Sequence, residues 1–340
     1  MRTATGDIQA RTGGARLVVQ LFVRVGVLPF FLAAGLVLFA LLSSKFLTLE
    51  NIVNVARQSV YLVLVSLGQM VVLITGGFDL SVGTVIALAS VISAMVMVSL
   101  GQLMPDHVWL VVMLGASAGL GAGLVVGLVN GVGVSVFGVS PFIMTLGVQS
   151  VGAGAALFLT GGVPVADLPP EFADTFGFGR VLGVPVPVLA ACVIGLGMWI
   201  FDARTRMGRY VHAIGGNIKA ARLSGINTRR TLFVAYGLCA VLAAATGLLL
   251  TARVESGDAN LGGTIALQSI AACVIGGVSL RGGIGRVENV VLGSFFIVLM
   301  QNGMNLLQIG SYMQMVLLGV LLILAVIADQ FRYRLLLGLP

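Results

Sequence analysis

Charged residues are scarce in this chain. Asp, Glu, Lys and Arg make up only 9% of its 340 residues, whereas 58% are hydrophobic and the mean hydropathy is +1.10. This composition leaves little room for a soluble fold, because many apolar runs approach the roughly 20 residues that cross a bilayer. The runs are continuously apolar rather than alternating, which indicates helices and not a β-barrel. We therefore expect an all-α polytopic membrane protein.

Lysine and buried acids are also rare. The two lysines, Lys45 and Lys219, are followed by Phe46 and Ala220, whereas a phosphate-binding loop of the form G-x-x-x-x-G-K-[ST] needs Ser or Thr there. Asp79 is the one carboxylate clearly amid apolar sequence, so the stock of buried acids that proton-coupled carriers use is missing. Any active transport would then draw its energy from another chain.

Metal ligands and nucleophiles show no useful pattern. Cys192, Cys239 and Cys273 lie inside apolar runs without metal or disulfide spacing. His107 and His212 have no ligand spacing, and no Ser/His/Asp constellation is visible. We expect no metal site, no catalytic residues and no cofactor bound by this chain, and we expect it not to be an enzyme.

Ten apolar runs predict ten membrane spans. Their approximate bounds are residues 27–42, 60–75, 82–100, 108–129, 141–159, 184–201, 232–251, 265–278, 290–307 and 312–327. Fifteen of the nineteen Lys and Arg residues then lie on the side of the N-terminus. Since positive residues are retained in the cytoplasm, both termini are predicted to be cytoplasmic. The net charge of +7 is then mostly a topology signal, and a nucleic-acid partner is not expected.

The whole chain, residues 1–340, is predicted to form a single transmembrane domain. Residues 1–26 form a cytoplasmic or interfacial N-terminus, and residues 15–26 are expected to lie along the lipid surface. The first apolar run is expected to be a retained anchor rather than a cleaved signal, because cleavage would invert the charge bias. Residues 202–230 are predicted to form a cytoplasmic loop.

That loop, residues 202–230, carries seven of the nineteen basic residues between two apolar runs. Within it, residues 215–225 read GGNIKAARLSG, which has the signals of a short helix. Asn217 is a good N-cap, because its side-chain oxygen can accept from an unpaired backbone N–H. Gly225 can end the helix in a left-handed conformation. We expect a cytoplasmic helix that can meet soluble partners.

Asp79 lies in residues 75–83, TGGFDLSVG, where two glycines weaken the helix. In one interpretation Asp79, assisted by Ser81, caps the next helix. In the other, a broken helix lets Asp79 line a pathway or latch a gate. The two can coexist. A related string, IGGVSLRGG at residues 275–283, fits either a shared structural role or chance similarity.

Several short sequence strings follow one another along the chain in a characteristic order. They are GGFDLSVG at residues 76–83, TRMGRY at 205–210, GGN at 215–217, RLSGI at 222–226, IAA at 270–272, IGGVSL at 275–280, GR at 285–286 and NGMNLL at 302–307. In order and spacing they resemble the ribose-type sugar permeases of bacterial ATP-binding-cassette importers. The resemblance extends over nearly the whole chain after the first span.

The resemblance implies a permease subunit, in the bacterial cytoplasmic (inner) membrane, that moves a sugar or polyol into the cell by alternating access. It also implies several partners: a second permease chain in a homodimer or heterodimer, cytoplasmic ATPase subunits that bind ATP and Mg, and a periplasmic substrate-binding protein. The loop helix would be the coupling helix that docks into the ATPase. The coupling residues would be Gly215, Gly216, Asn217, Ile218, Lys219, Arg222 and Gly225.

Two departures from the family pattern stand out. Family members often have Glu directly after the Gly-Gly-Asn string, whereas here Ile218 and Lys219 follow. Many relatives carry Glu-Leu-Asp before the Ile-Ala-Ala string, whereas this chain has Ala266, Leu267 and Gln268. The substrate is therefore not carried over from ribose.

The candidate pathway or gate residues are Asp79, Asn130, Gln268, Asn302 and Asn305. An uncharged polar lining suits a sugar or polyol, but amides in membrane helices also join neighbouring helices by hydrogen bonds.

A run of spaced glycines also has two interpretations. Gly119, Gly123 and Gly127 form two small-xxx-small steps that fit either a dimer seam or an internal contact.

Other functions remain open. One alternative is an ion-coupled secondary transporter or passive channel that acts without an ATPase, and another is a structural membrane subunit.

Overall fold

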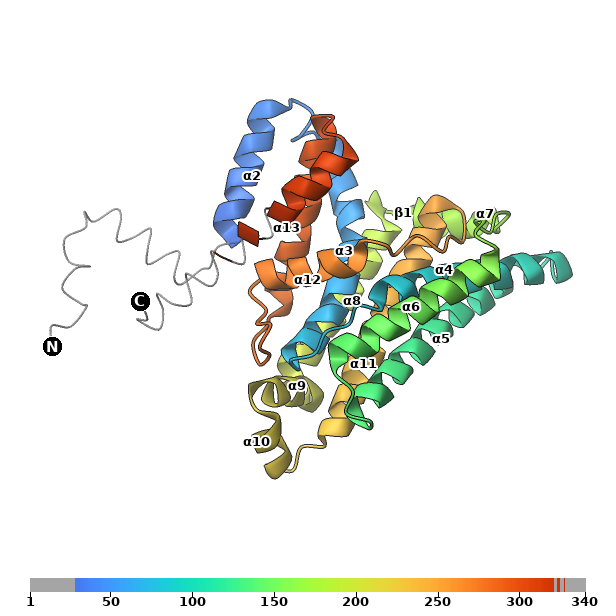
Figure 1. Cartoon of the computed structure of the whole chain (residues 1–340). Coiled ribbons are helices and arrows are strands. Elements are labelled where there is room, and N and C mark those ends of the chain that lie inside the picture. The colour runs from blue at the N-terminus through green and yellow to red at the C-terminus, as the bar shows by residue number, and fades with distance from the viewer. Residues whose placement is uncertain (1–27, 321–322, 325–326, 328–340) are drawn as a thin grey trace, which may run out of the picture.

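The structure is a computed structural model that describes residues 28–320, 323–324 and 327. Its helices pack side by side into a bundle, and short segments cap both ends (Figure 1). The helices of the first half are α2 (Leu28–Leu42), α3 (Leu49–Ile74), α4 (Val82–Leu103), α5 (Val108–Ser135), α6 (Pro141–Thr160) and α7 (Pro170–Phe172), with the π-helical turn η2 (Ala173–Gly177) after them. Those of the second half are α8 (Val186–Arg204), α9 (Arg206–Gly216), α10 (Ile218–Leu223), α11 (Thr228–Val254), α12 (Ile265–Ile275) and α13 (Val287–Leu306).

Extended structure is minor in this part of the chain. Strands β1 (Arg180–Val181) and β2 (Val184–Pro185) form a small antiparallel hairpin before α8. An isolated bridge joins Val165 to Gly257.

Within the described residues, seven helices are long and apolar enough to cross a membrane: α3, α4, α5, α6, α8, α11 and α13. Shorter apolar helices, namely α2, α12 and Ser311–Val320, coincide with the other three predicted spans. The prediction of an all-α polytopic protein is confirmed at this level, whereas ten spans and two cytoplasmic termini stay predictions. The predicted interfacial segment at residues 15–26 lies outside the described residues, as do both chain ends.

Helix α3 begins at Leu49 and not near residue 60 as predicted. Thr48 caps the helix, since its side-chain oxygen accepts from the backbone N–H of Asn51 at 3.4 Å. Glu50 in the first turn favours the positive end of the helix dipole. The hydropathy pattern places the start of the span too far along the chain, because Glu50 and Arg57 lower the hydropathy of a stretch that is nevertheless helical.

The eighth predicted span, residues 265–278, begins where predicted but is a short helix, and non-helical backbone precedes it. After α11 the chain follows α4 as a series of turns: the backbone N–H of Asp258 donates to the side-chain oxygen of Ser90 at 3.1 Å, and Gly262 packs directly on Gly83. Helix α12 begins only at Ile265, and its 11 residues extend about 16 Å at 1.5 Å per residue. Non-helical backbone in a membrane protein requires cover from protein, and here α4 supplies it.

The core lies along α3 and α11, which α4 and α5 flank. Two glycines of the small-xxx-small series face inward: a β-carbon added at Gly123 would lie 2.5 Å from the β-carbon of Ala244, and one at Gly127 would lie 2.5 Å from that of Ala240. The series therefore packs α5 against α11, which makes it an internal contact. Few residues of α6 and α8 are buried, as expected of helices that meet lipid or another chain.

Candidate functional site

Helices α9 and α10 project from one end of the bundle (Figure 1). Asn217 begins α10 as predicted, since its side-chain oxygen accepts from the backbone N–H groups of Lys219 and Ala220, both at 3.0 Å. Gly225 follows the C-cap with φ +82°, in the left-handed region that favours glycine. Its own N–H and that of Ile226 return to α10 carbonyls at 3.1 Å, which is a Schellman motif. The prediction of a capped short helix is confirmed.

The outward surface of α10 combines apolar and basic side chains. Leu223 is 90% exposed and Ile218 is 43% exposed. Lys219 and Arg222 are exposed beside them, whereas Ala221 is buried against the protein. Gly215, near the end of α9, lies instead against the backbone of Ile74 and Gly283. The loop therefore has a free side and a packed side.

The packed side of the loop is a backbone contact, which we call the glycine junction and which consists of Gly215, Gly216, Gly282 and Gly283. A β-carbon at Gly215 would overlap the carbonyl oxygen of Ile74, the last residue of α3, and the backbone nitrogen of Gly283. That nitrogen donates to the Ile74 carbonyl at 2.8 Å. The α9–α10 segment, the end of α3 and the α12–α13 loop therefore meet without intervening side chains.

Helices α3 and α12 end in the same way. Gly76 and Gly277 both have φ +82°. The N–H of each glycine returns to the carbonyl three residues back, and the N–H of the next residue, Gly77 or Val278, returns to the carbonyl five residues back. The two related strings therefore share a structural role, as one interpretation predicted. The structural register differs by one position from the sequence match, because Gly76 corresponds to Gly277 and not to Gly276.

Directly after α3 lies a buried polar group, the Asp79 cluster, which consists of Gln69, Asp79, Ser81 and Asn130. The Oδ1 atom of Asp79 accepts from the backbone N–H of Ser81 at 2.9 Å and from its hydroxyl at 2.6 Å. Asn130 donates from Nδ2 to the same hydroxyl oxygen at 2.7 Å. The Gln69 amide, oriented to suit both groups, donates to the carbonyl of Asp79 at 3.0 Å and accepts from its N–H at 3.2 Å. The cluster joins α3, α4 and α5.

Two further helices, α6 and α11, contact the turn between α3 and α4 that contains Asp79. The backbone N–H of Leu80 donates to the hydroxyl of Thr145 on α6 at 3.2 Å. The hydroxyl of Tyr236 on α11 lies 3.5 Å from the carbonyl of Phe78. Asp79 is fully buried, so in this conformation it supports the start of α4 and is closed to a solute. The N-cap position of α4 is Ser81, and no side chain makes a capping hydrogen bond there. The prediction that Asp79 caps α4 is therefore wrong, whereas a latch stays a prediction.

The other candidate pathway residues lie apart from this cluster. Asn302 is buried and exchanges two hydrogen bonds of 2.9 Å with Asn51 on α3, a contact that joins helices. Asn305 is exposed and accepts from Gln314 at 2.7 Å. Gln268 is partly exposed beside Thr264. The structure therefore brings together Asp79 and Asn130 from the predicted set, but not the remaining three.

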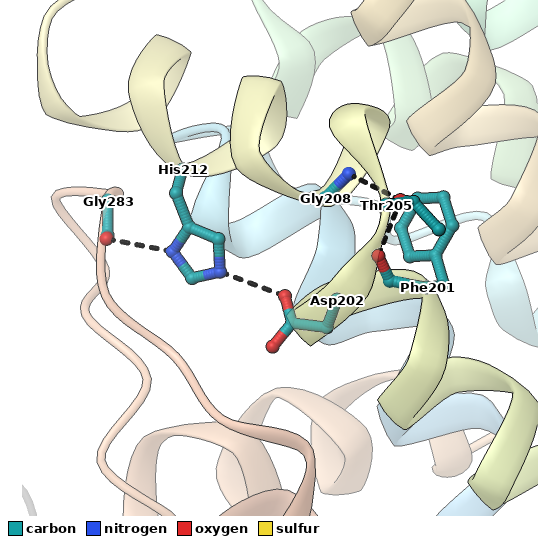
Figure 2. Close-up of polar contacts among 6 residues, drawn as sticks. All are labelled: Phe201, Asp202, Thr205, Gly208, His212 and Gly283. Carbon is teal, nitrogen blue, oxygen red and sulfur yellow. Dashed lines mark hydrogen bonds and ion pairs between the residues drawn. The ribbon is translucent and has the colours of Figure 1, made fainter.

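The sequence analysis missed a second constellation, at the corner between α8 and α9. Thr205 caps α9: its hydroxyl accepts from the N–H of Gly208 at 3.0 Å and donates to the carbonyl of Phe201 at 2.6 Å (Figure 2). A β-carbon at Gly208 would lie 2.5 Å from the carbonyl oxygen of Asp202. This tight corner sets Asp202 against His212. The sequence signal for this corner is Thr205, a good N-cap residue, followed three residues later by Gly208 in the TRMGRY string.

A cavity of about 340 Å³ opens beside His212. Its side-chain lining combines both signs of charge with an aromatic ring and consists of Trp199, Asp202, Ala203, His212, Arg286 and Glu288. The Trp199 indole donates to Glu288 at 2.7 Å. Among the described residues, no group of three or more His, Cys, Asp or Glu side chains could hold a metal ion.

Comparison with known proteins decides the family. Residues 51–326 match the family model described as the permease component of the branched-chain amino acid transport system. The chain belongs to this permease family. Such permeases are membrane transport subunits, which agrees with the seven candidate spans.

The permease is also similar to sugar permeases. It is 37% identical over 304 residues to the ribose import permease protein of Escherichia coli K12, with 88% of this chain and 92% of the relative covered. It is 35% identical over 302 residues to the D-allose transport system permease protein of the same strain, with 88% and 90% covered. It is 36% identical over 306 residues to the galactose/methyl galactoside import permease protein of Haemophilus influenzae, with 85% and 88% covered. No solved structure matches the permease.

These relatives confirm the resemblance stated from the sequence. The permease is a multi-pass membrane protein of the importer type, and no finding favours a carrier or channel that acts alone.

Proposed function

We propose that this permease is the membrane subunit of an ATP-powered importer that carries an uncharged sugar or polyol across the bacterial cytoplasmic membrane. The names of its relatives specify ribose, D-allose and galactose, whereas the family description specifies branched-chain amino acids. Among the described residues, Asp79 is the one charged side chain that is buried, and protein groups enclose it. Its second oxygen, Oδ2, has no hydrogen-bond partner, so the choice of a sugar over an amino acid rests on the named relatives.

The observation that supports an ATPase partner is the free side of α10. An apolar centre with a charged rim is the ordinary composition of a docking surface, and here Ile218 and Leu223 lie among basic side chains. Lys219, Arg222, Arg229 and Arg230 are all exposed on or next to this helix. Acidic groups on a partner would complement them and speed association. Glutamate, which is frequent in the family after Gly-Gly-Asn, is replaced by Ile218 and Lys219, so the partner surface should be adapted to an apolar and a positive group.

A short route leads from α10 to the Asp79 cluster. Gly215 contacts the backbone of Ile74, and only the turn of residues 75–78 separates Ile74 from Asp79. The contact is between backbones, so a displacement of the loop cannot be absorbed by side-chain rotation. Packed contacts of this kind transmit small shifts into discrete rearrangements. ATP would favour one state of the permease through its higher affinity for the closed ATPase dimer.

The opposite end of the permease suits a binding-protein partner. The bridge between Val165 and Gly257, with hydrogen bonds of 2.8 and 2.9 Å, ties the two longest loops at that end. These loops carry the acidic residues Asp167, Glu171, Asp174, Glu255 and Asp258. A periplasmic binding protein would dock there, and a second permease chain would complete the path.

Purification and reconstitution test the proposal. The chain is purified from its native membrane in mild detergent, co-purifying proteins are identified, and the complex is placed in vesicles with labelled ribose, D-allose, galactose or leucine. We expect an ATPase in the complex and ATP-dependent uptake of a sugar. Repeated recovery of the chain alone, with flux that needs no ATP, would show a self-sufficient carrier or channel. ATP-dependent uptake of leucine alone would refute the sugar assignment.

A further inference from the structure

His212 on α9 connects two segments that are distant in sequence. Its Nε2 atom lies 2.9 Å from Oδ1 of Asp202 on α8, and its Nδ1 atom lies 3.1 Å from the carbonyl oxygen of Gly283 in the α12–α13 loop (Figure 2). The side chain is partly exposed, at 30%, and that of Asp202 is 16% exposed. One imidazole therefore contacts both the end of α8 and the glycine junction.

Both partners of the ring are acceptors. A backbone carbonyl has no proton to donate, and an ionised carboxylate has none either. A neutral imidazole carries one N–H and could satisfy only one of the two contacts, whereas the imidazolium carries two. The geometry therefore fits His212 in its protonated form.

We propose that protonated His212 is a clamp that holds the α9–α10 segment against α8 and the α12–α13 loop, and that its loss at alkaline pH loosens the coupling between α10 and the Asp79 cluster. The clamp concerns this chain alone, whereas the effect on coupling rests on the proposed function. His212 is a positioning residue in this account, because it acts through the glycine junction and touches no substrate.

The anchors of the clamp are themselves fixed. The corner at Thr205 and Gly208 sets the position of Asp202. On the other side, the N–H of Gly283 is bonded to the Ile74 carbonyl at 2.8 Å, so its own carbonyl is held in place. Since Gly283 belongs to the glycine junction, a change at His212 acts at the end of α3.

Among the charged groups around His212, Asp202 is the one that favours a cation. The arginines nearest in sequence to His212 or to its partner Gly283, namely Arg206 and Arg209 on α9 and Arg281 in the α12–α13 loop, are exposed. The side chains that share its cavity are Asp202 on α8 and, at the start of α13, Arg286 and Glu288, whose opposite charges largely offset each other. The other charged groups on elements packed against α9 are Arg204 on α8, Lys219 and Arg222 on α10, Arg229, Arg230 and Arg253 on α11, and Glu50 and Arg57 on α3. Arg204 lies over the Trp199 ring at 5.8 Å, and the charged groups of α10 and of the start of α11 are exposed. Arg253, Glu50 and Arg57 lie in the halves of α11 and α3 that are distant from α9.

The direction of the pH effect follows. The hydrogen bond to Asp202 raises the pKa of His212 above its ordinary value, more than partial burial lowers it. A group with a raised folded-state pKa contributes stability that is complete below the unfolded value, about 6.5 for histidine. That contribution is lost as the pH rises through the raised value. The cavity of about 340 Å³ gives protons access to the ring.

The chain offers a direct spectroscopic test, because it has only two histidines. In a His107→Gln variant, nitrogen NMR of labelled imidazole reports His212 alone, with the purified chain in detergent and no ATPase or substrate. We expect both ring nitrogens to be protonated at pH 6.5, with a midpoint above that of free histidine. Asp202→Asn should lower this midpoint. A single neutral tautomer at pH 6.5, or a midpoint unchanged by Asp202→Asn, would overturn the clamp.

Transport measurements test the effect of the clamp on coupling. With the reconstituted complex, the number of ATP molecules hydrolysed per solute should rise between pH 6.5 and 8.5 in the parent protein. His212→Gln should give the high, alkaline-like ratio throughout, and the His107→Gln control should keep the parental profile. A His212→Gln variant with the parental profile would refute the link to coupling. If no ATP-dependent transport exists at all, the proposed function fails, while the NMR result still decides the clamp.

Discussion

Gly215 lies directly on the carbonyl oxygen of Ile74, so the loop that carries α10 rests on the last residue of α3. No side chain intervenes at this contact, and the N–H of Gly283 donates to the same carbonyl at 2.8 Å. The position of α10 and the end of α3 are therefore mechanically linked in this conformation.

Gly215→Ala tests that link. A methyl group would overlap the backbone of α3, and overpacking of this kind typically costs about 1–3 kcal/mol. The loop should move away from α3, and sugar uptake should fall about tenfold or more, which corresponds to about 1.4 kcal/mol of lost coupling. ATP hydrolysis by the complex should continue.

Gly216→Ala is the matched control, because Gly216 takes part in the glycine junction through its backbone N and Cα, which the substitution keeps. A β-carbon there meets nothing within 4 Å, and Ala is favoured over Gly in a helix by about 1 kcal/mol. We expect normal uptake and unchanged or slightly higher thermal stability. Equal loss of uptake in the two variants would refute the packing argument.

Gly225→Pro should abolish uptake and leave membrane insertion intact. Gly225 has φ +82°, whereas proline fixes φ near −65° and lacks the N–H that closes the end of α10. Gly225→Asn should retain much of the activity, because Asn tolerates the left-handed region. Uptake and surface exposure in whole cells are measured for both variants. Normal uptake by Gly225→Pro would mean that the end of α10 plays no part in coupling.

Asp79→Ala should destabilise the turn between α3 and α4. It would leave the backbone N–H and the hydroxyl of Ser81 without their carboxylate acceptor, and an unsatisfied buried donor costs about 1–3 kcal/mol. Asp79→Asn keeps an acceptor oxygen and should be milder. Thermal unfolding in detergent measures the difference, and an Asn variant as unstable as the Ala variant would show that the negative charge itself is required.

Asn302→Ala should lower stability without changing the apparent affinity for the sugar. The substitution leaves buried Asn51 without its partner, at a cost of about 1–3 kcal/mol. In a double-mutant cycle with Asn51→Ala, the two effects should be less than additive by about 0.5 kcal/mol or more. Gln268→Ala, at a partly exposed position, should instead weaken sugar affinity and leave stability unchanged. A weaker affinity in Asn302→Ala with normal stability would place Asn302 in the pathway.

The sequence predicted the local features of this permease well. The limits of α10 follow from Asn217 and Gly225, because caps depend on side-chain and backbone preferences of single residues. The helical membrane class follows from hydropathy. By contrast, the start of α3 was misplaced, since Glu50 and Arg57 conceal a helix that tertiary packing extends.

Long-range contacts explain the remaining differences. His212 has no ligand spacing in the sequence, because its partners Asp202 and Gly283 are brought together only by the corner at Thr205 and by the fold of the α12–α13 loop. Asn302 and Asn130 are both amides in apolar helices, and their sequence contexts do not distinguish an amide that joins α3 to α13 from one that supports Asp79. Which residue faces which helix depends on the packing of the whole bundle.

The central claim is that the free side of α10 docks onto an ATPase. A photoreactive amino acid at Leu223, which is 90% exposed, tests it against one at Leu182, which is fully exposed in the β1–β2 hairpin at the other end. After irradiation of native membranes, the account predicts a crosslink from position 223 to a cytoplasmic ATPase and none to it from position 182. Absence of an ATPase crosslink at position 223, with the variant active in uptake, would contradict the account.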